Sequence, residues 1–161
     1  MGVNMETILS IIAIILSVVS GVFSFYTFWW TSRRDRRQAT LEAYNRLQSE
    51  VFDNLNLYAP ADIRDSCIDT KSVEYKTISG YVARIEHFCV GLNKGIYDKS
   101  TFYSLAHGYF DGHQIRSRIE PVIESKNQSK NTKEVFYDDT LSVLVWMDNK
   151  TKKTVNRRCK K

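Results

Sequence analysis

The stretch that decides the fold is residues 7–30, TILSIIAIILSVVSGVFSFYTFWW. It contains no charged residue, and thirteen of its residues are Ile, Leu, Val or Phe. As a helix rising about 1.5 Å per residue it is about 35 Å long, which exceeds the hydrocarbon core of a bilayer, about 30 Å thick. Its apolar residues together favour insertion by about −4 to −8 kcal/mol. The stretch therefore predicts a transmembrane helix.

The alternative for such a stretch is a cleaved signal peptide, which requires a basic N-terminal region, a shorter apolar core and a small-residue cleavage site. Nothing before Glu6 is basic, and the stretch ends in bulky aromatic residues that include Trp29 and Trp30. Aromatic rings favour the membrane–water interface. We therefore expect residues 1–31 to form an anchor rather than a signal peptide.

Basic residues on one side of the stretch predict its orientation. The interface anchors expected there are Trp29, Trp30, Arg33, Arg34, Arg36 and Arg37. The positive-inside rule then places the N-terminus outside and the residues from about 32 onward in the cytoplasm, below an inner membrane. Three cysteines, an odd number without framework spacing, agree with reduced thiols in a cytosolic domain.

Small residues recur within the stretch at alternating steps of three and four. They are Ser10, Ala13, Ser17, Ser20, Ser24, Thr27 and Thr31, with Gly21 beside them. On a helix these positions share one face, where small side chains let two backbones approach closely. We expect the helix to self-associate into a homo-oligomer through this stripe. Two alternatives stay open: the stripe lines a narrow pore, or each hydroxyl bonds back to its own helix.

The residues after the anchor suffice for one compact domain, over 32–149. Apolar residues at helical spacing predict an all-α fold, a cytoplasmic bundle of about four helices. The helices are expected over 36–58, over 73–94, from 99 to a kink or break near Glu120 that Pro121 would cause, and over 134–149. The connection over 60–72 and the polar loop over 125–133 are expected to lie outside helices. The tail over 150–161 has seven basic residues in twelve and is predicted to be disordered.

Some details of these helices follow from single residues. Gly95 is placed to end the helix over 73–94, and Asp98 or Ser100 to cap the next one. The apolar residues expected on the last helix are Val135, Phe136, Leu141, Leu144, Val145 and Trp146.

The charge of the chain lies after the apolar stretch. All 23 basic residues and 17 of the 18 acids lie there, which leaves that part with a net charge of +6. Much of this positive charge lies at the two ends of that part of the chain, in the arginines after the anchor and in the C-terminal tail. Contacts with anionic lipids are therefore expected at both of these ends. The tail lacks an ordered groove-reading element, which makes nucleic acid an unlikely partner.

A search for catalytic or metal-binding motifs finds none. His87, His107 and His113 lack the spacing of a metal pair on a helix, and the common nucleotide-binding and hydrolase motifs are missing. We expect no catalytic residues, no metal and no cofactor. Glu86 and His87 stand in an otherwise apolar helix, and we expect Glu86 to contact Arg84 or Arg116. Glu86, His87 and Arg116 are thus a candidate polar cluster, structural or functional.

The segment over 81–125, YVARIEHFCVGLNKGIYDKSTFYSLAHGYFDGHQIRSRIEPVIES, resembles an uncharacterised family of small bacterial membrane proteins. The segments RRQATLEAYNRLQ (36–48) and EHFCVGLNKGIYD (86–98) carry part of the likeness, which covers residues 7–146. The matching positions are Glu86, Phe88, Gly95, Asp98, Arg116 and Pro121. The resemblance implies one N-terminal transmembrane helix and a helical domain, and it implies no activity.

Three hypotheses of function follow. The first is a non-enzymatic, single-pass membrane protein whose helical cytoplasmic domain binds a protein partner of unknown identity. The second is a membrane-damaging or pore-forming effector, for instance in bacterial anti-phage defence, with the stripe as the pore lining. The third is a membrane-anchored enzyme with a site around Glu86, His87 and Arg116. The first is favoured, because the sequence carries a self-association stripe and lacks catalytic motifs.

Overall fold

A computed structural model describes residues 4–111, 114–128 and 136–158 of the chain. It divides into two compact units, Met1–Gln38 and Ala39–Lys161, which are described separately here. The described residues are almost entirely helical and include no strand. The predicted all-α fold, with a long apolar N-terminal helix and a helical bundle, is therefore confirmed.

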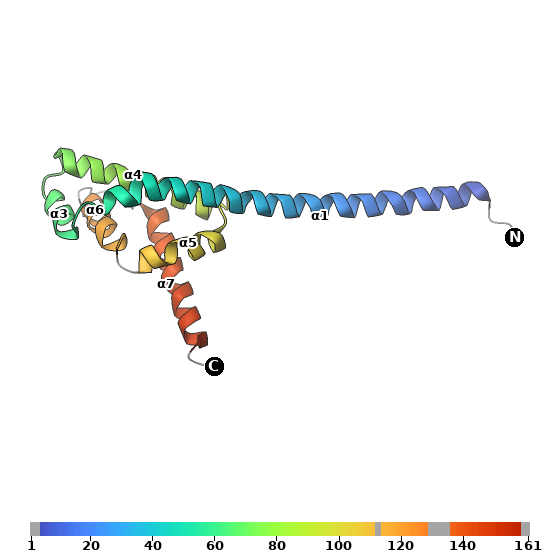
Figure 1. Cartoon of the computed structure of the whole chain (residues 1–161). Coiled ribbons are helices and arrows are strands. Elements are labelled where there is room, and N and C mark those ends of the chain that lie inside the picture. The colour runs from blue at the N-terminus through green and yellow to red at the C-terminus, as the bar shows by residue number, and fades with distance from the viewer. Residues whose placement is uncertain (1–3, 112–113, 129–135, 159–161) are drawn as a thin grey trace. The chain divides into compact units, whose positions relative to one another are not determined.

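The first unit consists of one helical segment. It belongs to α1 (Met5–Leu47), which continues to its end within the second unit (Figure 1). The described part of the chain holds one helix that is long and apolar enough to cross a membrane, and its most apolar window has a mean hydropathy of 2.6. A segment of this length and composition near the N-terminus fits a membrane span and a signal sequence alike.

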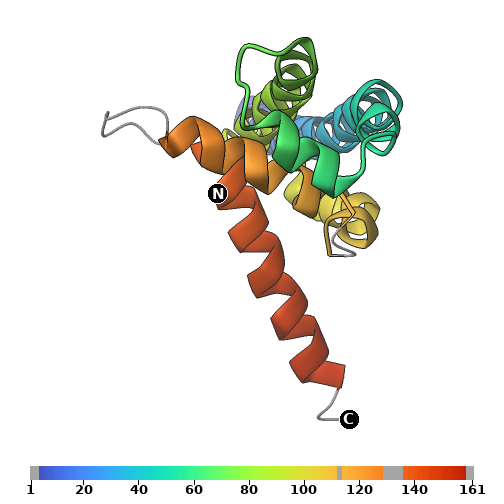
Figure 2. The ribbon, with the colours of Figure 1, turned by 90° about the vertical axis from the view of Figure 1, so that its left-hand side faces the viewer.

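The second unit is a helical bundle arranged around one central helix, α4 (Val73–Asn93). Its elements are the end of α1, η1 (Gln48–Phe52, a π-helical turn), α2 (Asp53–Leu55), α3 (Pro60–Ser66), α4 (Val73–Asn93), α5 (Lys99–Asp111), α6 (Arg116–Gln128) and α7 (Asp138–Arg158). Helix α4 packs against α7, α6, α3 and η1, while α3 also packs on α6 and α5 on α7. The C-terminal end of α7 extends away from the other helices of this unit (Figure 2).

Aromatic side chains form the centre of the core. Phe102 is fully buried, and its ring centroid lies 6.2 Å from that of Tyr44 and 5.2 Å from that of Phe88. Tyr44 also meets Phe52 edge to face at 6.1 Å. These rings come from α1, η1, α4 and α5, so the end of α1 is held in the second unit by aromatic packing.

Two predicted helix ends are confirmed. Gly95 has a φ of 72°, and the amides of Gly95 and Ile96 donate to the carbonyls of Leu92 and Gly91 at 3.3 and 2.9 Å. This is the reciprocal pair of a Schellman motif, for which glycine is the least strained residue. Asp98 caps α5, because its carboxylate accepts from the backbone amide of Thr101 at 2.7 Å.

The predicted connection over 60–72 was wrong in its first half, which is helix α3. Pro60 occupies the first helical turn, where its missing N–H costs nothing. The Asp62 carboxylate accepts from the Ala59 amide at 3.3 Å, and Ile63 is fully buried. A helix this short shows too few apolar positions for periodicity to reveal it.

The predicted break near Pro121 was also wrong. Helix α5 ends at Asp111, α6 begins at Arg116, and Pro121 lies inside α6. A proline inside a helix costs about 3 kcal/mol, but Ile119, Val122 and Ile123 of α6 are buried. Their burial contributes about 1.5–3 kcal/mol each, which exceeds that cost. Because α6 reaches Gln128, residues 125–128 of the predicted loop are helical, and 129–133 lie outside the described residues.

The last helix differs from its prediction at both ends. Helix α7 begins at Asp138 and continues through Arg158, so most of the tail predicted to be disordered is helical. Contacts with α5 support the extension: the Tyr103 and Thr151 hydroxyls lie 3.0 Å apart, and the Lys150 ammonium lies 4.3 Å from the Tyr103 ring. Not all of the expected apolar residues are buried, since Val145 is 58% exposed. The buried residues of α7 are instead Thr140, Val143, Leu144 and Met147.

Candidate functional site

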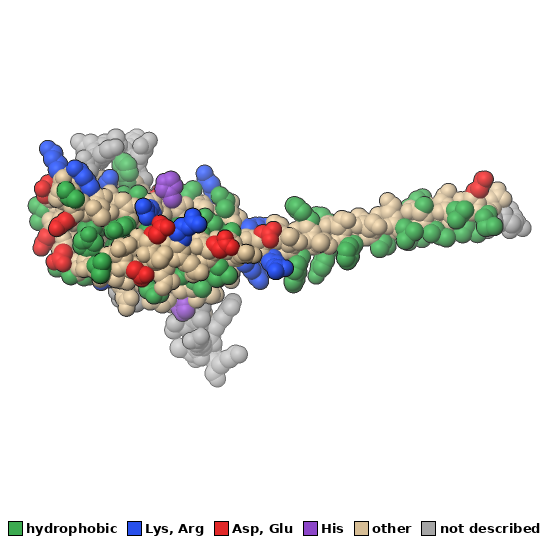
Figure 3. All heavy atoms as spheres, turned by 45° about the horizontal axis from the view of Figure 1, so that its top comes forward, with side chains coloured by type: hydrophobic (Ala, Val, Ile, Leu, Met, Phe, Trp, Pro, Cys, Tyr) green, Lys and Arg blue, Asp and Glu red, His purple; other side chains and the backbone are tan. Residues whose placement is uncertain are grey.

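The first candidate site is the apolar run at the start of α1. Large apolar side chains point outward all around this segment, and none of the most apolar window is buried. Phe23 and Phe25, for example, are 70% and 73% exposed. Figure 3 shows these hydrophobic side chains along the helix of the first unit, followed by blue basic ones. A contiguous apolar surface of this extent is untypical of a protein in water.

The small-residue stripe lies within this run. Its predicted members are Ser10, Ala13, Ser17, Ser20, Gly21, Ser24 and Thr27, and all are exposed helical residues. A Cβ atom built on Gly21 meets nothing within 4 Å, so the chain leaves this position open. The Thr27 hydroxyl donates to the Phe23 carbonyl at 2.8 Å, which is the local bond expected of a hydroxyl in an apolar helix.

The predicted interface anchors follow the run within the first unit. The Arg33 guanidinium lies 5.6 Å from the Trp29 ring centroid, a cation–π contact. Arg36 donates to the Ser32 hydroxyl at 3.5 Å, and the rings of Tyr26 and Trp30 stack at 6.3 Å. Trp30, Arg33, Arg34 and Arg37 together line a hollow of about 240 Å³.

The predicted polar cluster is not assembled, because its three members have separate surroundings. Glu86 accepts from the backbone amides of Asp139 and Thr140 at 3.2 and 2.8 Å, and from the Thr140 hydroxyl at 2.6 Å. Glu86 therefore caps the N-terminus of α7. The contact expected between Glu86 and Arg84 is replaced by an exposed ion pair of Arg84 with Glu50 at 3.1 Å.

Arg116 joins α6 to α7 instead of contacting Glu86. Its guanidinium donates to Glu120 at 2.6 Å and to both Asp148 carboxylate oxygens at 2.9 and 3.0 Å. The hydrogen bonds to Glu120, and then those to Asp148, raise the pKa of Arg116 above its usual value. Sequence reasoning missed Asp148 as a partner of Arg116, because the two residues lie 32 positions apart and meet only in the folded bundle.

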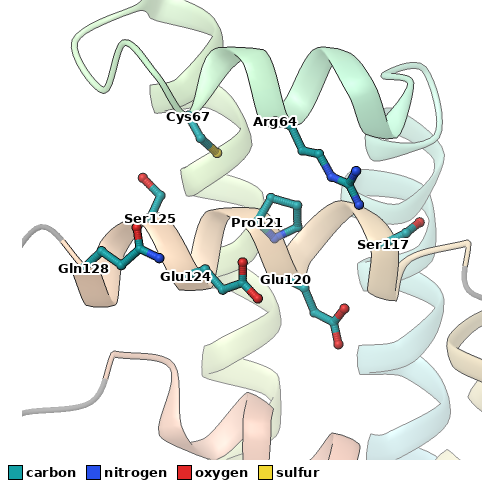
Figure 4. Close-up of a pocket in the computed structure, with 8 residues that line it drawn as sticks. All are labelled: Arg64, Cys67, Ser117, Glu120, Pro121, Glu124, Ser125 and Gln128. Atoms are coloured by element: carbon teal, nitrogen blue, oxygen red, sulfur yellow. The ribbon is translucent and has the colours of Figure 1, made fainter.

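His87 lines an open groove with residues of the end of α1, of η1 and of α4. The groove has a volume of about 410 Å³, and Phe88 lies in its wall beside Arg84 and Glu50. A second cleft of about 600 Å³ lies between α3 and α6 (Figure 4). In this view Arg64 of α3 and Cys67, which follows α3, reach toward α6, whereas the carboxylate of Glu120 points away from α3. The groove holds one imidazole, that of His87, and two carboxylates, Glu120 and Glu124, line the cleft.

Buried titratable groups of the second unit are held neutral. Burial raises the pKa of the Cys89 thiol to about 12, against an ordinary value of 9.0. Burial, then the neighbouring Tyr109, raises the pKa of Tyr44 to about 12. A thiol with so high a pKa is a poor nucleophile. Within the described residues, no three His, Cys, Asp or Glu side chains are grouped so that they could hold a metal ion.

Comparison with known proteins identifies a family for this chain. The model of the family described as "Domain of unknown function (DUF4760)" matches residues 12–138, from within the apolar run to the first residue of α7. No curated protein and no solved structure matches the chain. The resemblance to an uncharacterised family is confirmed at that level, and the description of the family names no activity, organism or location.

Proposed function

The chain belongs to the DUF4760 family, whose description assigns no activity, and we propose that it is a non-enzymatic, single-pass membrane protein. In this proposal the apolar run of α1 spans the inner membrane of a bacterial cell. The helical second unit then lies in the cytoplasm as a protein-interaction domain. Copies of the chain associate in the membrane through the small-residue stripe.

The observation that carries the proposal is the complete exposure of the apolar run. Its Ile, Leu, Val and Phe side chains have no partners within the first unit, although burying each would contribute about 1.5–3 kcal/mol. The hydrocarbon of a bilayer supplies that environment over the length of the run. The aromatic and basic residues at its end fit the headgroup region, with the basic side in the cytoplasm.

The second unit supports an interaction role rather than catalysis. Glu86 and Arg116 connect helices, Cys89 is a neutral thiol of the core, and His87 lies alone at the edge of an open groove. Every buried side-chain nitrogen and oxygen atom among the described residues has a hydrogen-bond partner. Networks of this kind fix a rigid helical unit.

The self-association step is tested with the double variant Ser17→Ile/Gly21→Ile of the full chain, by energy transfer between labelled copies in lipid bilayers. The added bulk separates helices that approach through the stripe, and we expect association to weaken about tenfold. A Cβ atom at Gly21 meets nothing within 4 Å, so the chain leaves room at this position for the start of a larger side chain.

The matched control is Val19→Ile/Phe23→Ile, which has the same spacing and the same new residues on the opposite face of the helix. We expect it to associate as the wild type does. Equal association of all three proteins would refute the stripe as the interface. Ion leakage that is abolished by replacing Ser17, Ser20 and Ser24 with Leu would instead favour the pore-forming hypothesis.

A further inference from the structure

We propose that Trp30, Arg33, Arg34 and Arg37 form a binding site for the headgroup of one anionic phospholipid. The inference deepens the proposed function and rests on it, because the site exists only if α1 crosses a bilayer. The sequence predicted contacts of the whole basic segment with anionic lipids. The proposal assigns a specific contact to one face of the helix and to one class of ligand, an anionic phospholipid.

The spacing of the four residues places them together. Positions i, i+3, i+4 and i+7 lie on one face of an α-helix, so the indole and three guanidinium groups share that face. They line a hollow of about 240 Å³ at the end of the apolar run. Trp29 lies beside the site, 5.6 Å from Arg33, and its ring face attracts that cation.

Among the described residues of the first unit, no acidic side chain lies on this face. At about 100° per residue, Asp35 lies about 150° around the helix from the centre of the face. In the part of the chain that the structure describes, Arg33, Arg34 and Arg37 form no ion pair. Arg36, on the neighbouring side, donates to Ser32. Three guanidinium groups without an ion-pair partner on one face therefore attract an anionic ligand.

A phospholipid fits this face better than a soluble anion does. The end of the run, marked by Trp29 and Trp30, lies at headgroup depth when the run spans the bilayer. The phosphodiester of a lipid lies at the same depth, and guanidinium groups bind phosphate in a bidentate manner. The Trp30 indole gives the hollow an apolar wall against which the glycerol and upper acyl region can pack.

The test uses the full chain reconstituted in bilayer discs. Native mass spectrometry then identifies the lipids that stay bound to the chain. The discs contain phosphatidylglycerol and phosphatidylcholine with identical acyl chains. The wild-type chain is expected to retain one phosphatidylglycerol in preference to phosphatidylcholine. Arg37→Gln should lower that preference about fivefold, which corresponds to the contribution of one basic residue near an anionic surface. Arg33→Gln/Arg34→Gln/Arg37→Gln should abolish it.

The matched control is Arg36→Gln, which removes one charge from the same segment but from outside the site. It should keep the wild-type preference. An equal loss in Arg36→Gln and Arg37→Gln would overturn the proposal, because the preference would then be a property of the whole charged segment. Displacement of phosphatidylglycerol by inorganic phosphate would overturn the assignment to a lipid.

The same preparation separates the failure of this proposal from that of the proposed function. A chain that stays in the bilayer discs but shows no preference for phosphatidylglycerol leaves the membrane anchor intact and refutes the lipid site alone. A chain that does not enter the discs refutes both.

Discussion

At the scale of single residues, two glycines of α4 provide a sensitive test of the packing of the second unit. A Cβ atom on Gly91 would lie 2.5 Å from Cε2 of Tyr97, whose ring stacks on Phe88 at 4.9 Å. Gly91→Ala must therefore displace that ring. We expect a net loss of about 1–2 kcal/mol in the free energy of unfolding, since overpacking costs about 1–3 kcal/mol and the gain in helix propensity offsets part of it.

Gly80 is the matched control on the same helix. A Cβ atom there meets nothing within 4 Å, so Gly80→Ala should gain the propensity of alanine, about 0.8–1.0 kcal/mol. Chemical denaturation of the two variants beside the wild type measures both changes. If Gly91→Ala were as stable as Gly80→Ala, the contact between Gly91 and Tyr97 would not be present in the protein.

Several single-residue features could be predicted from the sequence because they depend on local backbone chemistry. Gly95 ends α4 and Asp98 caps α5, and both roles are fixed by residues only a few positions away. The partners of Glu86 could not be predicted in this way. They are backbone amides of residues 139 and 140, which the bundle brings to α4 from a distant part of the chain.

At the scale of elements, the junction of α4 and α7 depends on one carboxylate. Glu86 uses both of its oxygens to accept three hydrogen bonds from the first turn of α7. Glu86→Gln keeps the shape but replaces one acceptor oxygen by a donor and removes the charge that favours a helix N-terminus. We expect a loss of about 1–2 kcal/mol, measured by thermal or chemical unfolding.

The control for this junction is Glu124→Gln, an exposed carboxylate on α6 with the same change of charge. Its unfolding free energy should stay within about 0.5 kcal/mol of the wild type. A Glu86→Gln variant that is as stable as Glu124→Gln would show that the cap does not hold α7 in place.

The elements that sequence patterns did not reveal share a physical cause. Helix α3 has one fully buried apolar residue, Ile63, so periodicity could not find it. Pro121 was expected to end a helix, but burial of its neighbours in α6 outweighs the local cost. The last turns of α7 are rich in lysine, and contacts with Tyr103 support them from outside the helix. In each case tertiary packing overrides a local preference.

At the scale of the whole molecule, the two units have different chemical requirements. The second unit has its own core of aromatic and aliphatic side chains, with buried polar groups paired among the described residues. The apolar run of the first unit has no such core and exposes its side chains throughout. The composition of the sequence predicted a separate anchor over residues 1–31, because an uncharged stretch is followed there by arginines. The proposed site around Trp30 required the arrangement on the helix.

The measurement that tests the central claim most directly is the mass and location of the chain in cells that express it with no N-terminal tag. Membranes are washed at alkaline pH, and the molecular mass of the chain in the membrane and soluble fractions is determined by mass spectrometry. A spanning α1 predicts that the chain stays in the washed membranes at its full mass of 18.7 kDa. A soluble product that lacks the apolar run would show that residues 7–30 are a signal sequence, and it would contradict the account.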